Sequence, residues 1–475
     1  MHNKYDILQG NEQDPQHVSQ FLAQELEIFL SPFLHVLNCL VDKRLVDACL
    51  QTMIAMLRFR NMKQGLKLSE LGSYIAGYLK EVITAPAGTK RIGNFLRSLK
   101  WSASLIDTYL VEEADKQLRE LIKQGKRVLC IHDSSVVEKP ESSKSDELCP
   151  VISSKSKRLT RSKRGKVFNE PRARPVMVTG MHWKAALLAG MQGLPQVVMM
   201  KWSTTRGDYA ENQREAEKDI FRHLAYKWNT LVLHIFDRGY ASGPWLELAQ
   251  ELHVKFVIRW IKTHLFFDEA GNQKNLWKIG HNKKYFSQKL IFDVKTGVKI
   301  YCDIWWAPVT HASYAGQLYV VKIRSKKHIM RLITNERITS EEQAWEIFFA
   351  YTRRWQVETS FRYGKSELAM ESPCLRTWEN TLKLLGLVTL VYAFLLHLLQ
   401  DPYGRIKDYL LRLKCHRTGK KCQNTQAPLY RFRWALSRLW DEHPPARCSF
   451  FPPYLVKRHL IAALNGDEMW QKNSG

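Results

Sequence analysis

Acidic residues are scarce in this sequence relative to basic ones. The 475 residues include 72 Lys and Arg against 46 Asp and Glu, so the formal net charge is +26 at pH 7. A basic excess of this size usually indicates a polyanionic partner, and nucleic acid is the first candidate because each neutralised phosphate releases counterions. A basic protein without such a partner, or one that binds an anionic membrane surface, remains an alternative.

A regular cysteine framework is also missing. The nine cysteines are scattered, and no CxxC pair occurs among them. An odd count at irregular spacing argues for free thiols in a reducing compartment. Cys415, His416 and Cys422 lie close together, with His443 and Cys448 further on, but this spacing supports a structural zinc site only weakly.

The sequence lacks an apolar N-terminal segment, internal repeats and low-complexity tracts. It starts MHNKYD and stays polar, which is unlike a signal peptide. One stretch, Thr381 to Gln400, is apolar enough to suggest a membrane span, but it carries Lys383 and His397. We interpret it as a buried helix and expect no membrane partner. The expected location is the cytoplasm, in association with the bacterial nucleoid.

Both ends of the chain are predicted to be helical. Residues 1–125 space their apolar side chains at three and four residues, interrupted by a basic turn from Ala85 to Lys100. This region is a candidate DNA-binding domain, and a packing or dimerisation module is the alternative. Residues 377–475 are again helical and basic, and we expect them to take part in dimerisation.

The middle of the chain alternates short apolar strands with helices. Residues 126–264 contain five predicted strands, at Lys126–His132, Val176–Trp183, Gln196–Trp202, Thr230–Phe236 and Lys255–Trp260. With predicted helices at Tyr209–Lys227 and Pro244–Leu252, this pattern indicates an α/β core. Residues 265–335 are typical of a β-rich insertion. Residues 336–376 return to the core, with a helix that starts at Ser340.

A strongly basic loop follows the first core strand. From Ser154 to Arg174 it holds nine Lys or Arg, opposed by Glu170. Blocks of like charge are usually solvated and mobile. Because the loop begins about twenty residues after Asp133, we expect it to reach DNA through side chains such as Lys163 and Arg164.

Two aspartates are predicted at the ends of core strands. Asp133 follows VLCIH and leads into Ser134 and Ser135, and Asp237 follows LVLHIF and leads into RGY. Each alone is weak evidence for a site, because an Asp at the end of a strand often only caps the following turn.

A third acidic residue, Glu358, lies in the run YTRRWQVETSFRYGK from Tyr351 to Lys365. On a single helix, at about 100° per residue, five polar side chains share one face: Tyr351, Arg354, Glu358, Arg362 and Lys365. Trp355 borders this face. The alternative is a solvated face with an ion pair between Glu358 and Arg362.

The three acidic residues suit one kind of chemistry. Phosphodiester cleavage by two metal ions needs carboxylates that hold the ions about 3.5–4 Å apart. Mg²⁺ prefers oxygen ligands and keeps several waters, so few protein ligands suffice. Asp133, Asp237 and Glu358 are therefore candidate metal ligands, and the neighbouring Arg and Lys side chains would hold the DNA backbone.

The spacing Y-x2-R-x3-E-x6-K resembles the signature of the IS-four family of insertion-sequence transposases, relatives of the Tn-five transposase. Tyr351, Arg354, Glu358 and Lys365 occupy its four positions without a gap. The family also places its first Asp before Ser or Thr, and its second in a run like DRGY, as at Asp237. The resemblance covers residues from about 126 to 375.

This resemblance implies an RNase H-like fold in which Asp133, Asp237 and Glu358 bind two Mg²⁺ ions per site, with Mn²⁺ able to substitute. It also implies double-stranded DNA contacts from Tyr351, Arg354, Trp355 and Lys365. Arg238, Arg259 and Arg362 are added to the candidate DNA contacts because of their charge and position. Members of the family cut and paste their elements as a synaptic homodimer, reading terminal inverted repeats with the N-terminal region and forming a hairpin on the element end.

One position departs from the family pattern. Met330 stands where some relatives hold a tryptophan that stacks on a flipped base, and stacking favours a flat aromatic ring. Trp305 or Trp306 could replace it, although each is otherwise typical of a core or surface aromatic. The alternatives to a transposase are a metal-dependent nuclease that cuts without rejoining and a DNA-binding descendant that has lost catalysis.

Overall fold

A computed structural model describes residues 14–78, 83–142, 147–153, 176–293, 298–325, 328–400, 403–414 and 429–446. The chain forms two compact units, one from Met1–Tyr109 together with Ser366–Gly475 and the other from Leu110–Lys365. The sequence analysis treated the two helical ends as separate regions, whereas the structure groups them in one unit.

The first unit is helical in its described parts. Its helices are α1 (Pro15–Leu40), α2 (Lys43–Arg58), α3 (Leu68–Tyr78), α4 (Ala85–Arg97), the start of α5 (Ser104–Lys123), α11 (Trp378–Leu398), α12 (Gly404–Tyr409), the π-helical η5 (Leu410–Lys414) and α14 (Leu429–Glu442). The predicted basic turn at 85–100 was wrong. Thr84 caps α4 by accepting a hydrogen bond from the N–H of Ala87, and Ile92, Phe95 and Leu96 bury one helix face.

Helix α11 is the apolar stretch that was interpreted as a buried helix. It is long and apolar enough to cross a membrane, with a mean hydropathy of 1.8, and 83% of its most apolar window is buried. Its Lys383 ammonium donates to the carbonyl oxygens of Leu96 at 3.0 Å and Ser98 at 2.8 Å, at the C-terminal end of α4. A buried lysine is stable there because it satisfies carbonyls that the end of α4 leaves unpaired.

The second unit is built on one mixed sheet, which confirms the predicted α/β class. Its core strands are β1 (Val128–Glu138), β2 (Cys149–Ile152), β3 (Met177–Gly190), β4 (Gln196–Ser203), β5 (Leu233–Phe236) and β6 (Lys255–Arg259). β1 pairs antiparallel with β3 and parallel with β5, β3 pairs antiparallel with β4, and β5 pairs parallel with β6.

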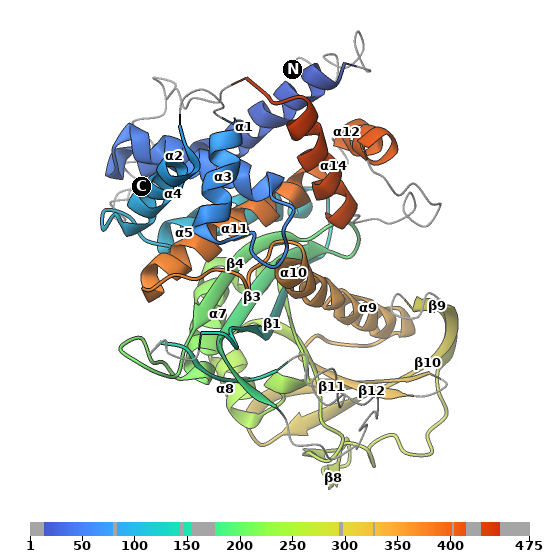
Figure 1. The fold of residues 1–475 in the computed structure, drawn as a ribbon. Helices are drawn as coiled ribbons and strands as arrows, with labels where there is room; N and C mark the ends of the chain where they lie inside the picture. The colour runs from blue at the N-terminus through green and yellow to red at the C-terminus, as the bar shows by residue number, and fades with distance from the viewer. Residues whose placement is uncertain are drawn as a thin grey trace, which may run out of the picture. The chain divides into compact units, whose positions relative to one another are not determined.

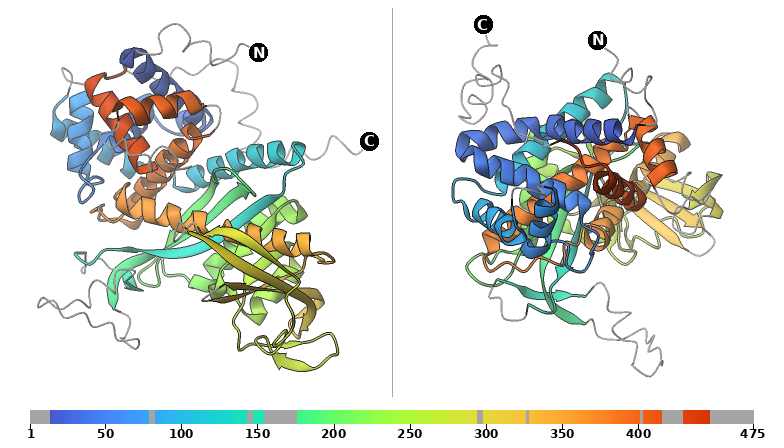
Figure 2. Two further views of the ribbon diagram at one scale, coloured as in Figure 1. Left: turned by 90° about the vertical axis from the view of Figure 1, so that its right-hand side faces the viewer. Right: turned by 45° about the horizontal axis from the view of Figure 1, so that its top comes forward.

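Helices cover both faces of this sheet (Figure 1, Figure 2). α7 (Gln213–Trp228) and the second half of α5 pack on the face that carries Val128 and Cys130 of β1. α8 (Gly243–Glu251) packs on Phe236 of the same face. On the other face lie α9 (Glu341–Thr352) and α10 (Trp355–Ser366), and α9 packs on β5, β10 and β11. Short 3-10 turns occur at η2 (Asn229–Leu231) and η3 (Arg238–Tyr240).

The predicted β-rich insertion extends the core sheet. It contains β7 (Leu265–Phe267), β8 (Gln273–Asn275), β9 (Ser287–Asp293), β10 (Val298–His311), β11 (Tyr314–Ser325) and β12 (Ile329–Thr334). β12 pairs antiparallel with β6, so that Leu332 lies opposite Arg259. Core and insertion therefore share one sheet, which has twelve strands in the described part of the chain.

Two local predictions near the acidic residues need correction. β1 does not end at Asp133 but continues to Glu138, because the longer strand β3 pairs with it along its whole length. The single helix predicted from Tyr351 to Lys365 is two helices, which meet at Arg353 and Arg354. The N–H groups of Arg354 and Val357 donate to carbonyls three residues back rather than four, and this tightens the chain and separates α9 from α10.

Candidate active site

Asp133 and Asp237 lie on one face of the sheet for a reason visible in the strand pattern. Side chains alternate between faces along a strand. Cys130 and His132 of β1 face α7, so Asp133 faces the side of α10. In the parallel pair of β1 and β5, His132 lies opposite Phe236, and Asp133 and Asp237 are therefore the next residues of two adjacent strands.

Glu358 reaches the same place from α10, in the first turn of that helix. The residue that joins all three carboxylates is Arg354, at the junction of α9 and α10. Its Nη1 donates to Asp133 Oδ2 at 2.6 Å, its Nη2 donates to Glu358 Oε1, and its Nε lies 3.8 Å from Asp237 Oδ1. The ion pair that Glu358 makes is thus with Arg354, and the alternative pair with Arg362 is not the one observed.

Two more side chains of the same sequence run point into this site. The hydroxyl of Tyr351 donates to Asp237 Oδ1 at 3.0 Å, and Lys365 Nζ donates to Ser135 Oγ at 3.0 Å. Tyr351, Arg354, Glu358 and Lys365 therefore gather around the two aspartates, although they come from two helices and not from one.

Burial and charge act differently on the two aspartates. Burial raises the pKa of Asp133 to about 6, although the Arg354 charge and the N–H of Ser134 favour its ionised form. Burial also acts to raise the pKa of Asp237, but Arg354, the N–H of Arg238 and the Tyr351 hydroxyl together lower it. Burial and the nearby Asp237 charge raise the pKa of Tyr351, so its hydroxyl stays protonated and donates.

The remaining predicted DNA contacts lie around the site with different exposure. Trp355 is half-buried at the start of α10, and Arg362 is exposed. Arg238 is exposed directly after Asp237, and Arg259 at the end of β6 is half-buried and close enough to favour the ionised form of Asp237. Lys163 and Arg164, with the rest of the basic loop 154–174, lie outside the described residues, as do Cys415, His416, Cys422 and Cys448.

The sequence analysis missed the residues that support the turn after Asp237. Arg214 Nη2 of α7 donates to the carbonyl oxygen of Gly239 at 2.6 Å, and its guanidinium lies 5.7 Å from the centre of the Tyr240 ring. Tyr240 is buried, and its hydroxyl bonds the side chain of Ser134 beside Asp133. Nothing in the spacing of α7 singles out Arg214 from its charged neighbours.

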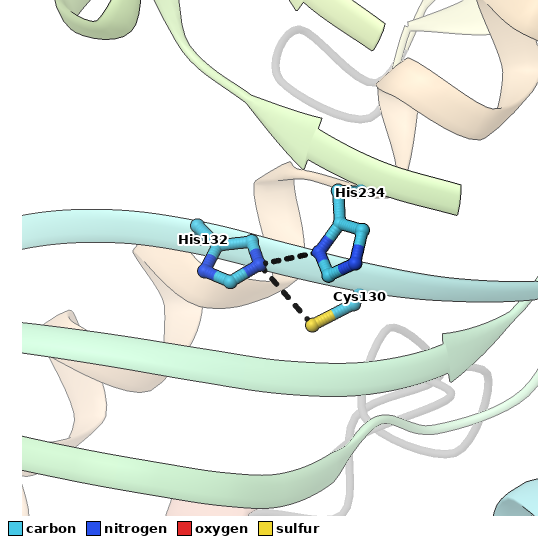
Figure 3. Close-up of side chains that lie close together, drawn as sticks. All are labelled: Cys130, His132 and His234. Carbon is cyan, nitrogen blue, oxygen red and sulfur yellow. Dashed lines mark hydrogen bonds between the residues drawn. The ribbon is translucent and has the colours of Figure 1, made fainter. Parts of the chain in front are cut away.

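Cys130, His132 and His234 form a buried polar cluster (Figure 3). The cluster lies on the face of the sheet that packs against α7, opposite the carboxylates. His132 Nε2 is 2.9 Å from His234 Nδ1 and 3.2 Å from Cys130 Sγ, and all three side chains are buried. Burial lowers the pKa of both histidines, so both rings are neutral. The ligand atoms lie within 4.8 Å of one another, but sulfur and imidazole donors suit a soft cation rather than Mg²⁺. The cluster is therefore separate from the carboxylate site.

The aromatic residues of the insertion differ in exposure. Trp305 is buried under Gly280, whereas Trp306 is half-buried beside Phe286 and Tyr319. Met330 on β12 is half-buried opposite Ile323 of β11. Of the two tryptophans that could replace the expected stacking residue, Trp306 is thus the accessible one.

Comparison with known proteins bears on part of the site. Residues 208–394 match the family described as "Transposase DDE domain". This match covers less than half of the chain, and the DDE domain match includes Asp237 and Glu358 but begins after Asp133. A search of curated proteins gave no match.

One solved structure similar to the chain is a piggyBac transposase synaptic complex with hairpin DNA, determined by cryo-EM. The sequence identity is 11%, the TM-score is 0.39, and the likeness covers 90% of this chain and 76% of the other. A likeness this weak assigns neither fold nor function to the chain.

Proposed function

We propose that the protein is a cut-and-paste DNA transposase of the IS-four kind. The observation that carries the proposal is the convergence of Asp133, Asp237 and Glu358 on the single guanidinium of Arg354. Two of these carboxylates lie in the segment that matches the transposase DDE domain. The intact triad disfavours a DNA-binding descendant without catalysis.

The proposed fold of the catalytic core is RNase H-like. Three antiparallel strands, β4, β3 and β1, are followed in the sheet by β5 and β6, which run parallel to β1. This arrangement supports the proposal because β1 and β5 are adjacent and parallel, which places Asp133 of β1 beside Asp237 directly after β5. The third carboxylate, Glu358, comes from α10 on the same face of the sheet.

The three carboxylates fit divalent metal. They offer hard oxygen ligands from three separate elements, and they already converge on one cation, the Arg354 guanidinium. We propose two Mg²⁺ ions per site, with Mn²⁺ as a substitute, held by Asp133, Asp237 and Glu358. Bound there, such ions would supply an activated water or 3′ hydroxyl and stabilise the leaving oxygen of the phosphodiester.

The other side chains of the site orient the carboxylates and neutralise phosphate charge. Tyr351 fixes Asp237 through its hydroxyl, and Arg214 holds the turn that follows. Lys365 and Arg259 add positive charge beside the aspartates, where a DNA phosphate would need it. Trp355, Arg362 and Arg238 extend this cationic and aromatic surface outward.

Several finer features belong to the same proposal. Double-stranded DNA with terminal inverted repeats is the proposed substrate, residues 1–125 would read it, and residues 377–475 would join two copies into a synaptic dimer. The proposed location is the bacterial cytoplasm. Because Met330 replaces the expected tryptophan, the hairpin step depends on another aromatic, for which Trp306 is the accessible candidate.

The experiment that tests this function is cleavage and joining of a labelled DNA that carries the ends of its own element, in Mg²⁺. We expect the intact protein to cut at the element boundary and join the 3′ ends to a target, and Asp133→Ala, Asp237→Ala and Glu358→Ala to bind but not cut. Cutting without joining would identify a nuclease. Binding without any cutting by the intact protein would identify a DNA-binding protein.

A further inference from the structure

Arg354 occupies the position between the proposed metal ligands. It contacts one oxygen of each carboxylate, namely Asp133 Oδ2, Glu358 Oε1 and Asp237 Oδ1. A guanidinium placed there neutralises part of the mutual repulsion of three negative charges that lie within a few ångströms of it.

The guanidinium and a divalent cation cannot share this position. Arg354 is buried, with 8% of its surface exposed, and repulsion between two nearby cations is poorly screened in such an environment. If a cation displaced the guanidinium without offering it another partner, the result would be an unpaired buried charge, which is strongly destabilising. Binding of metal therefore requires Arg354 to leave and to find another anion.

Arg354 belongs to neither of the two neighbouring helices. It lies at the break between α9 and α10, where its N–H and that of Val357 bond carbonyls three residues back. The neighbouring Arg353 is anchored instead, since its Nε donates to the carbonyl oxygen of Gly190 at 3.1 Å. The side-chain hydrogen bonds of Arg354, by contrast, go to the carboxylates of Asp133 and Glu358 within the described part of the chain.

We propose that Arg354 is a built-in competitor of the metal ions, which holds the three carboxylates together until metal displaces it. The displaced guanidinium then serves a phosphate of the bound DNA. This inference rests on the proposed function, because it takes the same carboxylates as the metal ligands. It assigns Arg354 two successive partners, whereas a simple phosphate-binding role assigns one.

The test is Mn²⁺ binding to the full-length protein without DNA, measured by electron paramagnetic resonance or calorimetry. We expect Arg354→Ala to bind Mn²⁺ at least about tenfold more tightly than the intact protein, a difference of about 1.4 kcal/mol. Arg362→Ala removes one positive charge from α10, the helix that follows Arg354, without removing a carboxylate partner, and should change the affinity much less. Arg354→Lys, which keeps the charge but loses the forked contact, should fall between.

Each result has a distinct meaning. Equal or weaker Mn²⁺ binding by Arg354→Ala would overturn the inference, while loss of binding in Glu358→Gln would leave the proposed metal site standing. Equal tightening in Arg354→Ala and Arg362→Ala would also overturn it, because general charge would then explain the change. If neither the intact protein nor Arg354→Ala bound Mn²⁺, the proposed function and the inference would both be wrong. Arg354→Lys keeps the test usable if the alanine variant does not fold.

Discussion

The two aspartates of the site are chemically different although they are neighbours. Asp133 lies inside β1 and is more deeply buried, and its pKa is raised to about 6. Asp237 follows the end of β5, where the N–H of Arg238 and the Tyr351 hydroxyl can both reach it, and its pKa is lowered. The hydrogen bond from the Tyr351 hydroxyl therefore favours the ionised form of Asp237 in particular.

Removing that hydroxyl gives the first prediction. In Tyr351→Phe, we expect Asp237 to lose its neutral donor while the ring keeps its packing. A hydrogen bond to a charged group contributes about 1.5–3 kcal/mol, so cleavage should slow by roughly tenfold to a hundredfold. The measurement is the single-turnover cleavage rate, with the melting temperature as a check on folding. An unchanged rate would show that the tyrosine does not orient Asp237 during the reaction.

The proximity of the candidate site residues on α9 and α10 could be predicted because it follows from their spacing in one short stretch of sequence. The spacing of Tyr351, Arg354, Glu358 and Lys365 placed four side chains together, and the structure gathers them around Asp133 and Asp237. Arg354 was expected at DNA rather than between the carboxylates, since a spacing shows that residues are near one another but not which partners they choose. Arg214 could not be found because its partner, the carbonyl of Gly239, is set by the tertiary fold.

At the scale of elements, helix and strand types were predicted better than their ends. Residues 85–100 were predicted to form a basic turn, whereas Ala85–Arg97 form α4, in which Pro86 lies in the first turn, where proline is compatible with the start of a helix. β1 was ended too early because Asp133 and the serines after it interrupt the apolar pattern, and only pairing with β3 shows that the strand continues. The split of α9 from α10 depends on local hydrogen bonding that periodicity does not reveal.

The insertion provides a prediction at this scale. Gly280 has a φ of +74°, and a Cβ there would lie 2.4 Å from the ring of buried Trp305. We expect Gly280→Ala to destabilise the protein through both backbone strain and overpacking, the second contributing about 1–3 kcal/mol. Gly271→Ala is the matched control, because Gly271 has a φ of +77° and open space around its Cβ position.

Thermal or chemical unfolding of both variants separates the two effects. The loss in free energy of unfolding for Gly271→Ala measures the strain of the backbone alone, and the excess in Gly280→Ala measures the contact with Trp305. Equal losses in the two variants would mean that Trp305 moves aside, and that Gly280 is not needed to seat it in the core.

At the scale of the whole molecule, the charge of +26 was the first indication of a nucleic-acid partner. What the sequence could not give was the association of its two ends, since Met1–Tyr109 and Ser366–Gly475 share one compact unit only through contacts distant in the chain. Long-range association of this kind depends on side-chain packing across hundreds of residues, which local periodicity does not encode.

The charge leads to a prediction about salt. DNA affinity should fall steeply as salt rises, because each neutralised phosphate contributes a slope of roughly −0.9 in log K against log salt. Fluorescence anisotropy over a range of salt concentrations should give a slope of about −6 or steeper for the intact protein, and a closely similar slope for Glu358→Gln. A slope near zero would mean that phosphate contacts do not drive binding.

The central claim is that Asp133, Asp237 and Glu358 hold the metal ions that cleave DNA. Replacing one of these carboxylate ligands by a thiolate tests it most directly. Asp237→Cys replaces a hard oxygen ligand with sulfur, which Mn²⁺ tolerates more readily than Mg²⁺. We expect this variant to lose cleavage in Mg²⁺ and to regain at least part of it in Mn²⁺, while Asp237→Ala stays inactive in both metals. Cleavage in Mg²⁺ by either variant, or the same response of both variants to Mn²⁺, would contradict the assignment of Asp237 as a metal ligand.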